Sequence, residues 1–195
     1  MIQFNIITKL GDIFERNEIV KSDEKELFTY GLQQGLIMIL NIVSSIVIGI
    51  LFGMVWESIL FMVAYIPLRS YAGGYHARTQ TRCYILSIGI MGAVLWGIKF
   101  IDWTNFNCLV LALIGGLIIF IFAPRGDENK PLDELEKVVY KSRARRILLV
   151  EELLILVFMF LGWNRVAFCI VMALMALSFM LIIDYAKSKL KIICK

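Results

Sequence analysis

The chain has 195 residues, of which 59% are hydrophobic and only 18% are charged, and its formal net charge is +4. Soluble domains carry about a quarter of their residues as charged side chains, so this composition excludes a soluble globular protein and predicts an integral membrane protein. The N-terminal stretch has no basic region ahead of an apolar run and no small-residue cleavage site, so we expect no cleavable signal.

Residues 1–21 predict an amphipathic helix that lies in the cytoplasmic membrane interface. Their apolar side chains repeat at helical spacing and oppose a charged face. The apolar residues are Ile2, Ile6, Ile7, Leu10, Ile13 and Phe14, and the charged ones are Lys9, Asp12, Glu15 and Arg16. The alternative is that the apolar face binds a partner helix.

Six apolar runs follow that reach or approach the roughly 20 residues that a helix needs to cross a bilayer. They lie at 31–52, 55–68, 83–101, 106–122, 147–162 and 166–183. They predict an all-α integral membrane protein with six transmembrane helices, folded as a single membrane domain over 1–195. Its parts are the interfacial helix (1–21), spans one to four (22–123), a polar insertion (124–146), and spans five and six with a basic tail (147–195). The second run is short, so the segment after it is expected to begin in a recess below the membrane surface.

The basic residues are distributed unevenly along the chain. Eighteen of the 20 Lys and Arg residues lie in 1–30, 69–82, 124–146 and 187–195. With six spans these four regions fall on one side, which the positive-inside rule assigns to the cytoplasm. Only Lys99 and Arg165 lie near the three short connections on the other side. We therefore expect a multi-pass protein of the cell membrane with both termini in the cytoplasm.

The polar insertion, "PRGDENKPLDELEKVVYKSRARR", contains seven basic and five acidic residues. Pro131 can start a helix whose acidic residues precede its basic ones, an order that matches the helix dipole. The insertion is predicted to be a solvated helix ending in a positive-inside cluster or, alternatively, a docking surface for an acidic peptide segment. The two glutamates at 151 and 152 are expected to form salt bridges with Arg145 or Arg146.

The stretch "RSYAGGYHARTQTRCY" at 69–84 contains the residues that predict chemistry. The chain's only histidine, His76, lies seven residues before Cys83, and an imidazole that accepts a thiol proton makes a cysteine a competent nucleophile. Nearby arginines would favour the thiolate, and two glycines could let the backbone approach a substrate and offer amide donors to an oxyanion. These supporting residues are Arg69, Arg78, Arg82, Gly73 and Gly74. Together they predict a Cys/His acyl-transfer site.

The spacing of the two residues constrains their conformation. A straight helix from His76 to Cys83 would hold their Cα atoms about 10.5 Å apart, which is too far for direct proton transfer. We therefore expect the segment to be broken and Cys83 to open the third span. The other cysteines, at 108, 169 and 194, form no disulfide pattern, and all four are expected to be thiols. One histidine and one cysteine cannot form a zinc site, and we expect no metal, other cofactor or nucleic-acid partner.

Three polar residues lie on one face of the first span at spacings of seven and four: Gln34, Asn41 and Ser45. Polar side chains in lipid turn toward protein. They are expected to form hydrogen bonds between helices, within the bundle or in a homodimer, or alternatively to line a peptide groove. Candidates for a third catalytic residue are Gln33, Gln34, Ser70 and Glu152, and the sequence does not rank them.

The residues described above resemble the signature of the AgrB family, the membrane cysteine endopeptidases that process autoinducing-peptide precursors in Gram-positive quorum sensing. One part of the resemblance is Arg69 followed by "GGYH" and by Cys83 with Tyr84. The other is "FAPRGDENKP" at 122–131, similar to the family's segment after the fourth span, with Lys130 next to its final proline. The resemblance extends over the whole chain in length, span number and block order. The insertion here is more acidic than the lysine-rich versions in the family.

The resemblance implies that His76 is the general base and Cys83 the nucleophile for cleavage near the C-terminal end of an AgrD-like precursor. Release of the acidic tail would leave an acyl-enzyme thioester, which a thiol or hydroxyl of the precursor would attack to form a thiolactone or lactone. A recessed Cys83 would exclude water, so that cyclisation outcompetes hydrolysis. An amphipathic leader of the precursor would meet the enzyme in the plane of the bilayer, near residues 1–17 and the first span.

Two other classes of protein are compatible with the composition. One is a small transporter or exporter, which should carry charges deep inside its spans. The acidic residues of the spans, Glu151, Glu152 and Asp184, instead lie toward the cytoplasmic ends. The other is a noncatalytic membrane scaffold, which would not need His76 and Cys83 together.

The distribution of basic residues yields a topology prediction. Single cysteines introduced at positions 135 and 190, and a reporter at position 76, should be found inside, whereas positions 103 and 164 should be labelled from outside. Labelling of position 135 from outside would contradict both the six-span arrangement and a cytoplasmic active site.

Overall fold

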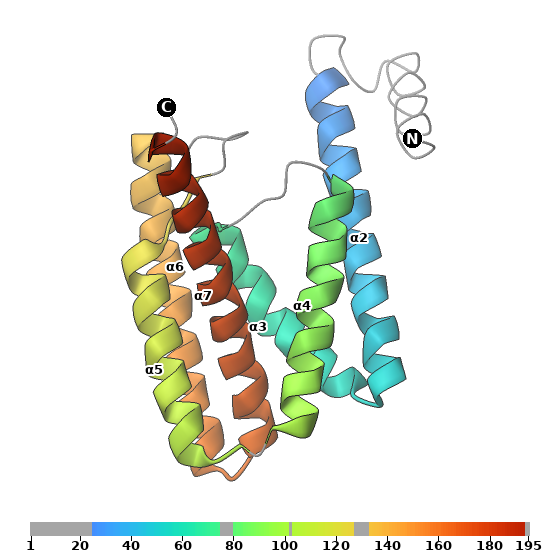
Figure 1. Cartoon of the computed structure of the whole chain (residues 1–195), viewed down its shortest axis with the longest axis vertical. Helices are drawn as coiled ribbons and strands as arrows, with labels where there is room; N and C mark the ends of the chain where they lie inside the picture. The colour runs from blue at the N-terminus through green and yellow to red at the C-terminus, as the bar shows by residue number, and fades with distance from the viewer. Residues whose placement is uncertain (1–24, 75–79, 102, 127–132, 194–195) are drawn as a thin grey trace. The chain divides into compact units, whose positions relative to one another are not determined.

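A computed structural model describes residues 25–74, 80–101, 103–126 and 133–193. Within these ranges six α-helices follow one another along the chain (Figure 1). They are α2 (Lys25–Phe52), α3 (Val55–Ala72), α4 (Gln80–Phe100), α5 (Asn105–Phe122), α6 (Glu134–Phe160) and α7 (Asn164–Ile193). The chain divides into two compact units, 1–44 and 45–195, and each is described by itself. The predicted interfacial helix at 1–21 lies outside the described residues.

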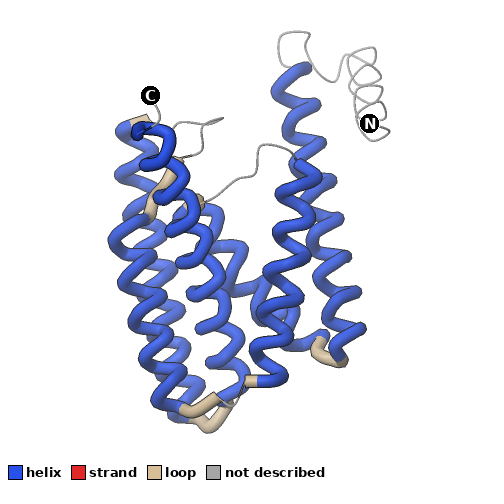
Figure 2. Tube along the Cα trace, in the orientation of Figure 1, coloured by secondary structure: helices blue, strands red, loops and turns tan. Residues whose placement is uncertain are grey.

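The helices confirm the all-α prediction, since each predicted apolar run falls within one helix, apart from at most two residues at the end of the run. Figure 2 shows short loops between α2 and α3 and between α6 and α7. Four of these helices, α2, α4, α5 and α7, are long and apolar enough to cross a membrane. Helices α3 and α6 are not among these four. Helix α3 contains Glu57, Pro67 and Arg69, and α6 begins in the charged insertion. Six spans with cytoplasmic termini therefore remain a prediction.

Helix α7 is the centre of the unit formed by residues 45–195, because it packs against α3, α4, α5 and α6. The side chains that it turns inward are fully buried: Ala167, Cys169, Val171, Ala173, Leu174, Leu177 and Leu181. Lipid is as apolar as these side chains, so helices in a bilayer associate through close packing and hydrogen bonds rather than through the hydrophobic effect. Both occur between α7 and α5. Ser178 Oγ donates to the carbonyl oxygens of Gly115 (2.9 Å) and Leu174 (2.7 Å).

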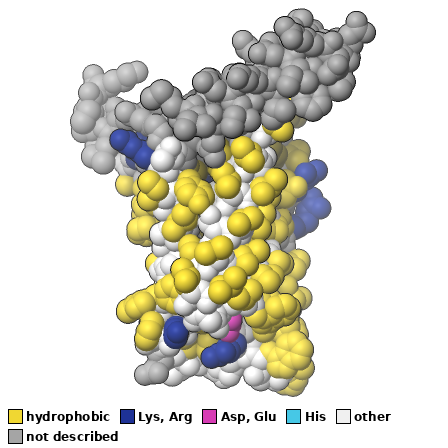
Figure 3. Space-filling model, turned by 90° about the vertical axis from the view of Figure 1, so that its right-hand side faces the viewer, with side chains coloured by type: hydrophobic (Ala, Val, Ile, Leu, Met, Phe, Trp, Pro, Cys, Tyr) yellow, Lys and Arg dark blue, Asp and Glu magenta, His cyan; other side chains and the backbone are white. Residues whose placement is uncertain are grey.

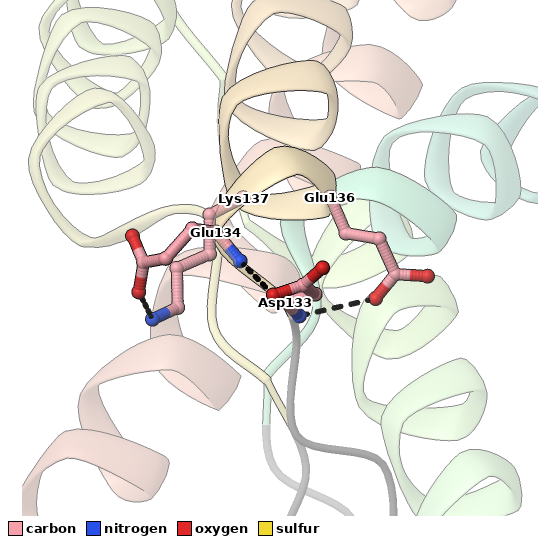
Figure 4. A network of polar contacts seen from close by, with 4 residues as sticks. All are labelled: Asp133, Glu134, Glu136 and Lys137. Carbon is pink, nitrogen blue, oxygen red and sulfur yellow. Dashed lines mark hydrogen bonds and ion pairs between the residues drawn. The ribbon is translucent and has the colours of Figure 1, made fainter.

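Helix α6 begins at Glu134, three residues later than the start at Pro131 that the sequence suggested. Asp133 is the N-cap of a capping box, in which its carboxylate accepts from the Glu134 N–H at 2.7 Å and the Glu136 carboxylate accepts from the Asp133 N–H at 3.2 Å (Figure 4). These contacts satisfy amide groups that have no partner within the helix, which sets the helix start. From there the helix runs without a break to Phe160, so the C-terminal half of the insertion and the predicted fifth span are one element.

The two basic residues that depart from the positive-inside pattern are bonded within the protein. Arg165, at the start of α7, donates from Nη1 to Oε1 of the buried Glu57 on α3 at 3.2 Å. Lys99, at the end of α4, donates from Nζ to the carbonyl of Phe52 at 3.1 Å. Figure 3 shows one face on which hydrophobic side chains cover the middle and the few charged ones lie toward its upper and lower ends. These two cations therefore connect helix ends instead of interacting only with solvent.

The close contact of α5 and α7 gives a stability prediction. A Cβ at Gly115 would lie 3.3 Å from the Cβ of Leu174, so Gly115→Val should overpack this interface and destabilise the protein by about 1–3 kcal/mol. Gly89→Val is the matched control, because Gly89 is an exposed glycine of α4 with no atom within 4 Å of such a Cβ. Thermal unfolding in detergent should show a clear loss for Gly115→Val and little change for Gly89→Val. Equal losses would mean that the glycine is not required for packing.

Candidate active site

The predicted catalytic segment follows the C-terminal end of α3. The helix ends at Ala72, and the Gly73 N–H donates to the Arg69 carbonyl at 3.1 Å. Gly73 and Gly74 then adopt φ values of 74° and 118°, a region that residues with a side chain rarely occupy. The two glycines therefore end the helix and turn the chain toward residues 75–79. Because the Gly73 N–H is already bonded, it is not available to an oxyanion, whereas the Gly74 amide remains a candidate.

The same turn contacts the segment that follows α5. The Arg125 N–H donates to the Ala72 carbonyl at 3.0 Å, and Gly73 and Arg125 form an isolated parallel bridge. A Cβ on Gly73 would collide with the Arg125 carbonyl oxygen, so this contact requires a glycine in addition to the positive φ. The two segments that the sequence singled out, 69–84 and 122–131, thus meet backbone to backbone.

The side chain of Arg69 stabilises this turn. Its Nη1 donates to the Gly73 carbonyl at 2.7 Å, four residues along the chain. The guanidinium also occupies the position next to Gly74 where a Cβ would collide with it. Arg69 therefore shapes the turn that leads to His76, in addition to any effect of its charge on a nearby thiol.

The side chain of Arg125 connects the turn to α7. Its Nε donates to Asp184 Oδ2 at 2.7 Å, and both side chains are about a quarter exposed, at 22% and 24%. The guanidinium also lies over the ring of Tyr185, 5.4 Å from its centroid. The Tyr185 ring in turn packs edge to face on Phe122 at 4.9 Å. The ends of α3, α5 and α7 are joined through this one arginine.

A second arginine of the polar insertion connects the turn to α6. Arg143 donates from Nη1 to the Tyr71 hydroxyl at 3.2 Å and lies over the Tyr71 ring at 5.3 Å. Tyr140 meets the same ring edge to face at 5.7 Å. The insertion, predicted to be solvated or to dock a peptide, therefore also supports the end of α3, through Arg125 at its start and Arg143 near its end.

Cys83 lies among the first four residues of α4, which confirms the prediction that it opens the third helix of the predicted bundle. It is a free thiol and is partly exposed. The other two cysteines in the described ranges, Cys108 and Cys169, are also free thiols but are completely buried. Cys194 lies outside the described residues. Of the three cysteines that can be compared, Cys83 is the one that a reagent or substrate can reach.

Tyr65 was missed by the sequence analysis. It lies one helical turn before Arg69 on α3, and its hydroxyl is close enough to interact electrostatically with both Arg69 and Cys83. Its ring stacks on Phe61 at 5.2 Å. A tyrosine within an apolar run is typical of core packing, and only its spacing of four from Arg69 could have pointed to this site.

The structure does not describe His76, Arg78, Lys130 or the side chain of Gln34. Arg82 is described as an exposed residue in the first turn of α4, next to Cys83. Of the residues predicted for the site, Arg69, Gly73 and Gly74 are in direct contact with one another. The roles of all the predicted site residues remain predictions.

The expected salt bridges of Glu151 and Glu152 are not formed in the part of α6 that the structure describes. Glu151 is buried and its Oε2 has no hydrogen-bond partner, while Glu152 lies against Gly116 of α5. Arg145 instead lies over the Phe120 ring, and Arg146 donates to Ser142. The expectation was wrong because helical neighbours are three or four residues apart, and these glutamates lie at least five residues beyond the arginines.

The contact between Gly73 and Arg125 can be tested with two matched alanine variants. Gly53 and Gly73 have almost the same φ, 69° and 74°, but only at Gly73 would a Cβ meet another part of the protein. Gly53→Ala should therefore incur only the conformational cost of about 1–2 kcal/mol. Gly73→Ala should incur that cost and also separate the two backbones, with at least twice the fall in melting temperature. Equal falls would contradict a structural role for this contact.

Known proteins were compared with the chain. A family model described as accessory gene regulator B matches residues 6–181. An AgrB-like protein of Clostridium perfringens is 30% identical over 157 residues, which cover 74% of this chain and 73% of that protein. The FsrB protein of Enterococcus faecalis is 26% identical over 142 residues, which cover 69% of this chain and 57% of that protein. No solved structure matches the chain significantly. The match along most of the chain and the similarity to these relatives show that the chain belongs to the accessory gene regulator B (AgrB) family.

Proposed function

We propose that this chain is a membrane cysteine endopeptidase that removes the C-terminal tail of an AgrD-like precursor and cyclises the remaining peptide. As a member of the AgrB family, the chain has a role in accessory gene regulator quorum-sensing peptide processing. The apolar helices α2, α4, α5 and α7 agree with a membrane location. The catalytic type and the residues that perform the reaction are the content of the proposal.

The observation that carries the proposal is the accessibility of Cys83 at the start of α4. A nucleophile has to reach a substrate carbonyl, and the fully buried thiols of Cys108 and Cys169 cannot do so without opening the core. His76 precedes Cys83 by seven residues, in the stretch between the turn at Gly73 and Gly74 and the start of α4. The length of chain between the two residues limits how far the base can lie from the thiol.

The proposed reaction has two acyl transfers. His76 accepts the Cys83 proton, and the thiolate attacks the carbonyl carbon of the scissile peptide bond. The C–N bond then breaks, the protonated His76 returns the proton to the leaving amine, and the precursor remains attached as a thioester. A thiol or hydroxyl of the precursor then gives its proton to His76 and attacks that thioester, which releases the Cys83 thiolate and closes the thiolactone or lactone ring.

Other residues are assigned the remaining functions in this proposal. The Gly74 amide and the Tyr65 hydroxyl are candidate donors to the oxyanion that forms in each step, and Arg69 holds the turn between them. Arg78, Arg82 and Lys130 are proposed to interact with the acidic part of the precursor. Gln34 and residues 1–21 are proposed to contact its membrane-bound leader. Water has to be kept from the thioester until the ring has closed.

Substitution of the two catalytic residues tests this mechanism. Cys83→Ala and His76→Ala should each abolish cleavage of a co-expressed precursor, and the double variant should be no worse, since members of one catalytic unit are not additive. Cys108→Ala and Cys169→Ala, compared at equal protein levels in the membrane, should retain cleavage. Replacing the cyclising residue of the precursor by alanine should allow a hydroxylamine-labile adduct on Cys83 to be trapped. Cleavage by Cys83→Ala would rule out the thiol mechanism and favour a noncatalytic role.

A further inference from the structure

A groove on α6 has no role in the proposed reaction. It is a shallow, open depression of about 490 Å³ rather than an enclosed cavity, and it is lined by Val138, Lys141, Ser142, Arg145, Arg146 and Leu149. All six residues lie on one helix, and each has another member of the set three or four residues away, which places most of them on one face. Three of them are cations. In the described part of the chain none of these three cations pairs with a carboxylate, since the ion pairs there involve other residues.

The cations of the groove are held in place by contacts that leave their donors available. The Arg145 guanidinium lies 3.9 Å from the centroid of the Phe120 ring, and its Nε is buried without a hydrogen-bond partner. Arg146 donates from Nη2 to Ser142 Oγ at 3.1 Å, which orients both side chains toward the groove. Nε is inaccessible to a bound acceptor, so an acceptor in the groove would use the Nη groups of Arg145, which donate to no residue in the described part of the chain.

The contact with Phe120 gives the depth of the groove relative to the apolar helices. Phe120 lies two residues before Phe122, where both α5 and the candidate span Asn105–Phe122 end. Arg145 is therefore level with the edge of the apolar part of α5. Beyond these cations toward its C-terminus, α6 exposes large apolar side chains, among them Leu149 at 68%, which also lines the groove, and Leu153 at 56%. The groove thus joins a basic cluster to a surface suited to hydrocarbon.

We propose that this groove binds the headgroup of an anionic phospholipid. The Arg145 and Arg146 guanidiniums and the Lys141 ammonium would contact the phosphate, with the Ser142 hydroxyl as a further donor. An acyl chain would lie along Leu149 and Leu153. Phosphates of a bilayer lie just outside its hydrocarbon, which is the level that the contact with Phe120 gives for these cations.

The dimensions of the groove favour a lipid headgroup over an acidic peptide segment. Lys141 and Arg146 are five residues apart, which corresponds to about 7.5 Å along the helix axis. A single compact phosphate can contact groups within that length. An extended peptide with several carboxylates would span a longer stretch, and it would not cover the exposed Leu149 and Leu153 beside the cations.

Binding of a short-chain phosphatidylglycerol to the purified full-length chain in neutral detergent tests the proposal. Arg145→Gln with Arg146→Gln removes two charges from the groove, and Lys137→Gln with Lys189→Gln removes two exposed charges outside it. The first pair should weaken binding at least about tenfold, because two charge-assisted hydrogen bonds are lost, and the second pair should change it little. Short-chain phosphatidylcholine should bind more weakly to the unmodified chain, since its headgroup carries no net charge.

Several outcomes would overturn this proposal. Equal weakening in the two double variants would mean that only overall charge matters, and equal binding of phosphatidylcholine would mean that the headgroup charge is not recognised. Binding of an acidic peptide that is lost in the groove variant, with phosphatidylglycerol unaffected, would identify a peptide site instead. If the groove variant does not fold, Lys141→Gln alone must still weaken phosphatidylglycerol binding, and no change in that variant would equally contradict the proposal.

Discussion

The backbone contact between Gly73 and Arg125 is the interaction on which the organisation of the candidate site depends. It joins the end of α3 to the end of α5, and the Arg125 side chain continues the connection to Asp184 on α7. A side chain at Gly73 would prevent the two backbones from approaching. Since His76 follows this turn in the sequence and α4 begins just before Cys83, the position of this contact determines where the predicted catalytic segment starts.

The polar insertion contributes different functions along its length. Arg125 and Arg143 support the turn at the end of α3, and the capping box at Asp133 starts a helix that continues through the predicted fifth span. The cations from Lys141 to Arg146, other than Arg143, line the groove proposed to bind a lipid headgroup. One continuous helix thus extends from the residues that support the α3 turn to the proposed lipid site. A dense basic segment can therefore stabilise the fold as well as orient it in the membrane.

Several features could be predicted because they depend on neighbours in the sequence. The six helices follow from apolar runs, and the position of Cys83 in the first turn of α4 follows from the length that a helix would otherwise impose between it and His76. Features that depend on which face of a helix a residue occupies were harder to predict. The expected pairing of Glu151 with Arg145 was wrong, and Tyr65 was overlooked because its place in an apolar run is also typical of packing.

The sequence by itself determined that the protein is helical and rich in apolar helices, that Cys83 lies near the start of a helix, and that the two segments 69–84 and 122–131 resemble the signature of the family. Only the tertiary structure decided that those segments touch, that Arg69 closes the glycine turn, and that Cys108 and Cys169 are inaccessible while Cys83 is not. The physical reason is that the spacing of apolar residues and the composition indicate whether a helix lies in an apolar environment, but not which other helices it packs against. The partners depend on which small residues and polar groups fit together across the bundle, as Gly115 does with Ser178 and Gly73 with Arg125.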